Sequence, residues 1–176
     1  MILFLLALAV LVLPLQWFVA IVLAALIHEL CHYLAIRCCG GEILGISMDV
    51  CGAKLEVAGL SNGQELFCAL AGPAGGLALL LLVRWMPRTA ICGAFQSLFN
   101  LLPIYPLDGG RALRCGMELI LPMEQADRVC LWVRRITVGL VIGLGVYGTV
   151  VLGLGLMPLL LGIVICGKIA CKPPRH

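Results

Sequence analysis

An almost wholly apolar run over residues 136–170 constrains the fold of this chain more than any other feature. At a rise of about 1.5 Å per residue, this run is too long for one crossing of a bilayer core about 30 Å thick. Met157-Pro158 interrupts it, so the run predicts two helices joined by a turn. Only 12% of residues are charged, against about 25% in soluble domains, and 62% are hydrophobic. The chain is therefore expected to be an integral membrane protein.

The rest of the chain extends this prediction to an all-α polytopic membrane protein with six spans. The spans are expected at about residues 2–13, 17–36 and 65–83, then from about 89 with an interruption at "NLLPIYPLDGG", and twice within 136–170. Glu42 to Ala58 is more polar and alternates imperfectly around Cys51-Gly52, which predicts a β-hairpin or re-entrant loop. One domain is expected over residues 1–176.

Basic residues are distributed unevenly between the two sides of this topology. With both termini in the cytoplasm, only Arg84 and Arg88 fall outside, which satisfies the positive-inside rule. A multi-pass protein of the cell membrane with both termini cytoplasmic is therefore expected. The lipid bilayer is therefore an expected partner. The sequence contains no basic run interleaved with aromatic residues, so nucleic acid is not expected as a partner. The ten cysteines fit small buried side chains better than a disulfide framework.

The second predicted span contains "HELCH", an H-E-x-x-H motif. On a helix, His28 and His32 are four residues apart and project from one face, as two ligands of one zinc ion require. Glu29 then stands beside them to handle the protons of a water molecule. Ionisable groups inside a span cost about 2.5–3.5 kcal/mol on insertion scales, so a metal site is favoured over a His–Glu pair that merely stabilises helix contacts.

A catalytic zinc site uses three protein ligands and leaves one position open. The remaining histidine, His176, is the last residue, so the third ligand is expected to be a carboxylate. Asp108, in "NLLPIYPLDGG", is the acidic residue at span depth. Pro103 and Pro106 break the helix there, and irregular backbone at that depth must be buried in protein or line a watery cavity. The alternative is a proline-kinked helix with Asp108 as its N-cap.

Taken together, "HELCH", "LAGPAGG" at residues 70–76 and "NLLPIYPLDGG" at residues 100–110 resemble the site-2 protease family of intramembrane zinc metalloproteases. The likeness covers roughly residues 17–121 and is greatest to the compact bacterial branch similar to the sporulation stage IV protease. The resemblance implies that Zn²⁺ is the cofactor and that Glu29 is the general base. It further implies that Asn100 hydrogen-bonds the substrate or the developing oxyanion. The implied metal ligands are His28, His32 and Asp108.

Other expectations follow from the same resemblance. The hairpin looks like the family's re-entrant β element, whose free edge could pair with an extended substrate strand, although a plain cytoplasmic hairpin fits equally well. No PDZ or nucleotide-sensing domain is expected. The family often has a polar residue at the end of "AGPxxN", where this chain has Gly76. The implied substrate is a membrane-associated protein or peptide, such as a pro-sigma factor, another tethered regulator or a leftover signal peptide.

The predicted function is therefore hydrolysis of a peptide bond in or near the transmembrane segment of such a substrate. Two other classes of protein are also compatible with the sequence. A metal transporter also places His and Asp at membrane depth, but it usually spreads polar residues along a path and often contains repeats. A catalytically dead scaffold would be expected to have lost Glu29 or a metal ligand, and this chain has them all.

Overall fold

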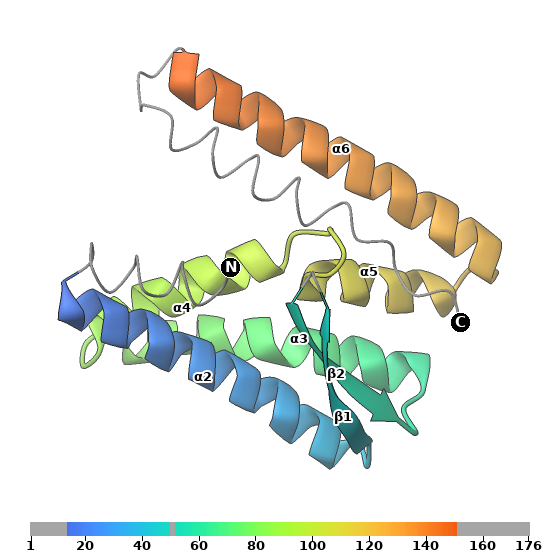
Figure 1. Cartoon of the computed structure of the whole chain (residues 1–176), viewed down its shortest axis with the longest axis horizontal. Helices are drawn as coiled ribbons and strands as arrows, with labels where there is room; N and C mark the ends of the chain where they lie inside the picture. Colours follow the sequence, from blue (N-terminus) through green and yellow to red (C-terminus); the bar gives the residue numbers. More distant parts are fainter. Residues whose placement is uncertain (1–13, 50–51, 151–176) are drawn as a thin grey trace.

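The computed structural model describes residues 14–49 and 52–150 and is mostly helical (Figure 1). Its elements are α2 (Leu15–Cys38), β1 (Glu42–Asp49), β2 (Gly52–Ala58), α3 (Asn62–Ala78), the 3-10 turn η1 (Leu79–Leu82), α4 (Pro87–Asn100), α5 (Asp108–Glu118) and α6 (Met123–Val150). Within the described ranges, three segments are long and apolar enough to cross a membrane: Leu15–Cys38, Asn62–Leu82 and Met123–Val150. A helical membrane protein with one small strand pair is thus confirmed.

The complete count of six spans stays a prediction. The predicted span at residues 2–13 and the turn at Met157-Pro158 both lie outside the described residues, as does His176. The predicted second and third spans correspond to α2 and to α3 with η1, each within a few residues of the expected bounds.

Helix α2 leads directly into the hairpin because glycine ends it. Gly40 has a φ of +75°, a left-handed conformation that glycine adopts without a steric penalty. The amide of Gly41 then bonds the carbonyl of Ile36 at 3.0 Å, which satisfies one of the last carbonyls of the helix. β1 therefore begins at Glu42, only a few residues after the helix ends.

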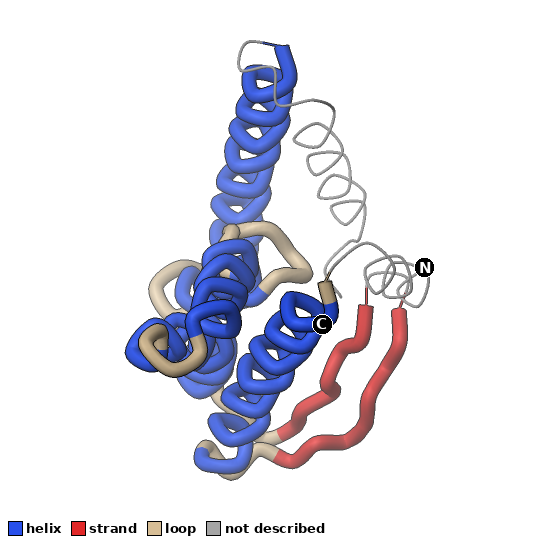
Figure 2. Tube along the Cα trace, turned by 90° about the vertical axis from the view of Figure 1, so that its left-hand side faces the viewer, coloured by secondary structure: helices blue, strands red, loops and turns tan. Residues whose placement is uncertain are grey.

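The hairpin is antiparallel, with Glu42 opposite Ala58 and Asp49 opposite Gly52. Its register shifts between Ile43 and Gly45. Figure 2 shows it as a long ribbon that extends beside the helices. This confirms the hairpin that the alternating sequence predicts. Its insertion into a membrane stays a prediction.

The predicted fourth span consists of two short helices. α4 has 14 residues, which span about 21 Å at 1.5 Å per residue and fall short of a bilayer core about 30 Å thick. It ends at Asn100 because Pro103 follows closely and cannot donate a helical hydrogen bond. α5 begins at Asp108, so the interruption predicted at "NLLPIYPLDGG" is confirmed.

The charged stretch before residue 136 is helical and continuous with the apolar segment that follows it. α6 begins at Met123 and continues through "EQADRVCLWVRR" into the apolar segment. Arg128 and Glu124 lie one turn apart on it, with 3.9 Å between Arg128 Nη2 and Glu124 Oε2. Opposite charges four residues apart suit the solvated turns of a helix.

Small residues set the distances between α3 and its neighbouring helices. A Cβ added at Gly76 would overlap Ser97 Oγ of α4 and lie 3.0 Å from the carbonyl oxygen of Gly93. A Cβ at Gly75 would overlap the thiol of Cys31 on α2. Membrane helices gain van der Waals contact when small residues allow such close approach. Ser97 thus fills the space that a side chain at position 76 would need.

The four-residue spacing of Gly139 and Gly143 on α6 is typical of close helix packing in membranes, but among the described residues there is no close contact at either glycine. A Cβ at Gly139 or Gly143 would meet no described atom within 4 Å. The described helices approach closely at the glycines of "LAGPAGG" instead.

Replacing Gly76 with Leu should therefore force α3 and α4 apart and destabilise the fold by about 1–3 kcal/mol, the usual cost of overpacking. The same change at Gly143 is the matched control, because nothing described is close to it. Thermal unfolding of both variants in detergent measures the difference. Equal midpoints for the two variants would show that the contact between α3 and α4 does not depend on Gly76.

Candidate metal centre

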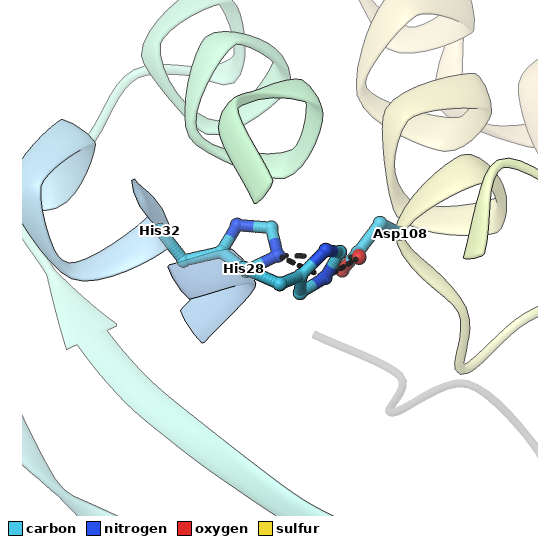
Figure 3. Close-up of side chains that lie close together, drawn as sticks. All are labelled: His28, His32 and Asp108. Atoms are coloured by element: carbon cyan, nitrogen blue, oxygen red, sulfur yellow. Dashed lines mark hydrogen bonds and ion pairs between the residues drawn. The ribbon is translucent and has the colours of Figure 1, made fainter. Parts of the chain in front are cut away.

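Three polar side chains from two helices meet in the interior. His28 and His32 lie one turn apart on α2 and are 1% and 7% exposed, and Asp108 is the first residue of α5. Asp108 Oδ2 lies 3.0 Å from His28 Nε2 and 3.2 Å from His32 Nε2. The two Nε2 atoms are 3.2 Å apart. Figure 3 shows both imidazoles and the carboxylate directed toward one point.

Asp108 does not cap α5, which decides between the two interpretations of its position. Leu107 is the N-cap residue, and no side chain caps this helix. The carboxylate instead faces the two imidazoles across 80 residues of sequence. The N-capping alternative is therefore wrong.

Glycine brings the backbone close to this aspartate. A Cβ at Gly109 would overlap the carbonyl group of Leu101, and a Cβ at Gly110 would overlap the backbone of Ile104 and Tyr105. The segment between α4 and α5 can therefore fold back onto the first turn of α5. This contact fixes the position of the Asp108 backbone.

The tautomer of His32 follows from its contact with α3. His32 Nδ1 donates a hydrogen bond to the carbonyl oxygen of Cys68 at 2.7 Å. The Nε2 atom of a neutral His32 therefore carries a lone pair, and this lone pair faces Asp108 and His28. Histidines that bind metals commonly donate their second nitrogen to a carbonyl in this way.

Gly72 makes that contact possible. A Cβ at this position would overlap the His32 imidazole, so any other residue would push the ring away from α3. The sequence signal for this role was present in "LAGPAGG", but which glycine faces which side chain depends on how α2 packs against α3.

The donor set fits a zinc ion. With bonds of about 2.0–2.1 Å, tetrahedral coordination separates ligand atoms by about 3.3–3.4 Å. The three observed separations of 3.0, 3.2 and 3.2 Å are shorter by only a few tenths of an ångström. One N–H on His28 cannot satisfy both the carboxylate and the lone pair of His32, whereas one cation can satisfy all three groups. His28, His32 and Asp108 can therefore hold a metal ion.

Asn100 and Glu29 occupy different places around this cluster. Asn100 is the last residue of α4, and its Nδ2 lies 3.1 Å from His28 Nε2, so its amide borders the cluster. Glu29 is exposed on α2 and makes no hydrogen bond or ion pair with the other described residues, although its carboxylate lies within electrostatic reach of His32. The structure thus brings four of the five predicted site residues together, whereas Glu29 is exposed and makes no hydrogen bond or ion pair with them.

Comparison with known proteins supports the same conclusion about the fold. No family model matches the chain. A protein of Synechocystis sp. with the name "Putative zinc metalloprotease" is 32% identical to it over 120 residues. This match covers 56% of the chain and 32% of the length of that relative.

The fold is also that of a solved structure. The site-2 protease of Methanocaldococcus jannaschii superposes with a TM-score of 0.63 over 92% of this chain and 80% of that one, at 18% sequence identity. This likeness confirms, at the level of the fold, the resemblance that the three motifs predict. The chain therefore has the fold of a site-2 protease, with a zinc-compatible donor set at its centre.

Proposed function

We propose that this chain is an intramembrane zinc metalloprotease that hydrolyses a peptide bond in or near the transmembrane segment of a membrane-associated substrate. The observation that carries the proposal is the convergence of His28, His32 and Asp108 within 3.2 Å of one another. The protease fold and the similarity to a zinc metalloprotease give that donor set its chemical context.

His28, His32 and Asp108 are the proposed zinc ligands. When bound, zinc supplies Lewis-acid chemistry, since it makes water a nucleophile near neutral pH and polarises a carbonyl group. Three protein ligands leave a fourth position open, as in other catalytic zinc sites. The hydrogen bond to Cys68 holds His32 in the tautomer that a ligand needs.

Glu29 and Asn100 are the proposed groups that act on the substrate. Glu29 takes a proton from the attacking water and passes it to the leaving amine. Its exposed side chain is free to turn toward a substrate, because no described residue holds it. Asn100 donates a hydrogen bond to the carbonyl oxygen as negative charge develops there, and its place beside His28 supports this role.

The substrate is proposed to be a membrane-associated protein, such as a pro-sigma factor or another tethered regulator. A peptide bond within a helix is shielded, so the substrate must unwind before it is cut. The hairpin offers strand edges with which an extended substrate segment could pair. We place the chain in the cell membrane with six spans and both termini cytoplasmic, as one domain over residues 1–176.

Replacing Glu29 with Gln should abolish proteolysis and leave zinc bound. Loss of a general base typically lowers the rate by about 10²–10⁴-fold, while the ligand set is unchanged. Cleavage of a membrane-tethered substrate in liposomes, together with zinc analysis of the same sample, measures both effects. Wild-type cleavage by E29Q would remove Glu29 from the mechanism, and zinc flux across the liposome membrane would favour a transporter.

Replacing Asp108 with Ala should weaken zinc binding by more than about 100-fold, since even an outer-sphere partner of a ligand is typically worth 10–100-fold. The matched control is D127A, which removes a carboxylate that is 57% exposed and lies outside the cluster. Competition with a chromogenic chelator gives both affinities. Full zinc retention by D108A would move the third ligand elsewhere.

Replacing Gly72 with Ala should lower zinc affinity by about 10–100-fold, because the added methyl group displaces His32 from the Cys68 carbonyl. G63A is the control on the same helix, because a Cβ there meets nothing within 4 Å. The same chelator competition measures both variants. If G72A and G63A bind zinc equally well, His32 does not depend on its contact with α3.

A further inference from the structure

The segment that leads to Asp108 is anchored by two buried apolar side chains. Ile104 is 1% exposed and is the largest fully buried side chain in the described part of the chain, and Leu107 is 8% exposed. The amide of Leu107 bonds the carbonyl of Ile104 at 2.8 Å, so the two residues form one turn. Because Leu107 directly precedes Asp108, the position of this turn determines the position of the Asp108 backbone and hence of its carboxylate.

Helix α6 holds that turn from the other side. Ile104 and Leu107 form a hydrophobic cluster in which Val138 and Val141 of α6 pack against them, together with Phe99 and Leu102. On α6, the half-buried Val138 and Val141 lie three residues apart and share one face, which the buried Gly145 continues. Figure 1 shows α6 running along the α5 side of the molecule, away from α2.

The two halves of the cluster share α3 as a neighbour, but their other principal packing partners differ. His28 and His32 belong to α2, which packs against α3 and α4. Asp108 belongs to α5, which packs against α3 and α6. A displacement of α6 would reach the carboxylate through Ile104 and Leu107, whereas the imidazoles lie on α2, which packs against α3 and α4.

We propose that α6 clamps the turn at Ile104–Leu107 and that Val138 and Val141 are positioning residues for the Asp108 carboxylate. The proposal rests on the function proposed above and deepens it, because it names what controls the geometry of the third ligand. Neither valine touches the reacting atoms; both act through the turn. A shift of α6 in the membrane would thus change the distance between the Asp108 carboxylate and the two imidazoles without moving α2.

The test compares two double variants that remove the same atoms from the same helix. V138A/V141A empties the contact with the turn. V146A/V150A is the control, because these valines are 43% and 75% exposed. Amide hydrogen exchange over residues 101–108 is measured in metal-free protein, so that it reports the turn independently of zinc. Zinc affinity by chelator competition and the visible spectrum of the Co²⁺-loaded protein report the ligand geometry.

We expect V138A/V141A to speed exchange over residues 101–108, to lower zinc affinity by about tenfold or more and to change the Co²⁺ spectrum, as loss of a ligand's support does. V146A/V150A should match the wild type in all three measurements. Unchanged exchange and an unchanged spectrum in V138A/V141A would overturn the clamp, even if its thermal stability fell.

A second variant covers the case in which V138A/V141A does not fold. V141A alone should show the same changes with smaller amplitude. V141I should keep the wild-type spectrum, because its side chain still fills the contact with the turn. The two proposals can fail separately. If the wild-type protein binds no zinc, the proposed function is refuted. If the valine variants still exchange faster at residues 101–108, the contact between α6 and the turn remains supported.

Discussion

Two imidazole nitrogens and one carboxylate oxygen lie within 3.2 Å of one another at the buried centre of this chain, and the neighbouring elements are arranged around this close approach of polar atoms. Polar groups removed from water cost free energy unless they find partners, and the cost is greater when the surrounding solvent is lipid. A shared cation relieves the crowding. The arrangement is therefore understandable as a metal centre and hard to explain as a packing feature.

Each neighbouring element contributes something specific to that centre. α2 supplies two imidazoles through its regular four-residue spacing, and α3 supplies a carbonyl that fixes the tautomer of His32. The absence of a side chain at Gly72 lets these two helices come close enough. The break between α4 and α5 delivers Asp108 to the opposite side of the imidazoles, and α6 supports that break through Val138 and Val141.

Local signals in the sequence predicted the elements well where a short pattern or a single residue is sufficient to specify them. The alternation between Glu42 and Ala58 predicted the strand pair, and Pro103 predicted the end of a helix. The structure adds that the charged residues from 124 to 135 are helical and continuous with the apolar segment that follows them. The spacing of Gly139 and Gly143 is typical of a close helix contact, but the described residues contain none at either glycine, because spacing alone does not identify a partner.

Hydropathy, alternation and helical spacing are local properties, so the amino-acid sequence alone was enough to predict a membrane protein, the hairpin and the pair His28 and His32. It also pointed to Asp108 and Asn100 through the motif that contains them. Helix packing, by contrast, determines that Asp108 faces the histidines rather than capping a helix, that Gly72 makes room for His32, and that α6 packs against the turn before Asp108. These are contacts between residues at least 30 positions apart, and no local pattern specifies how helices pack against one another.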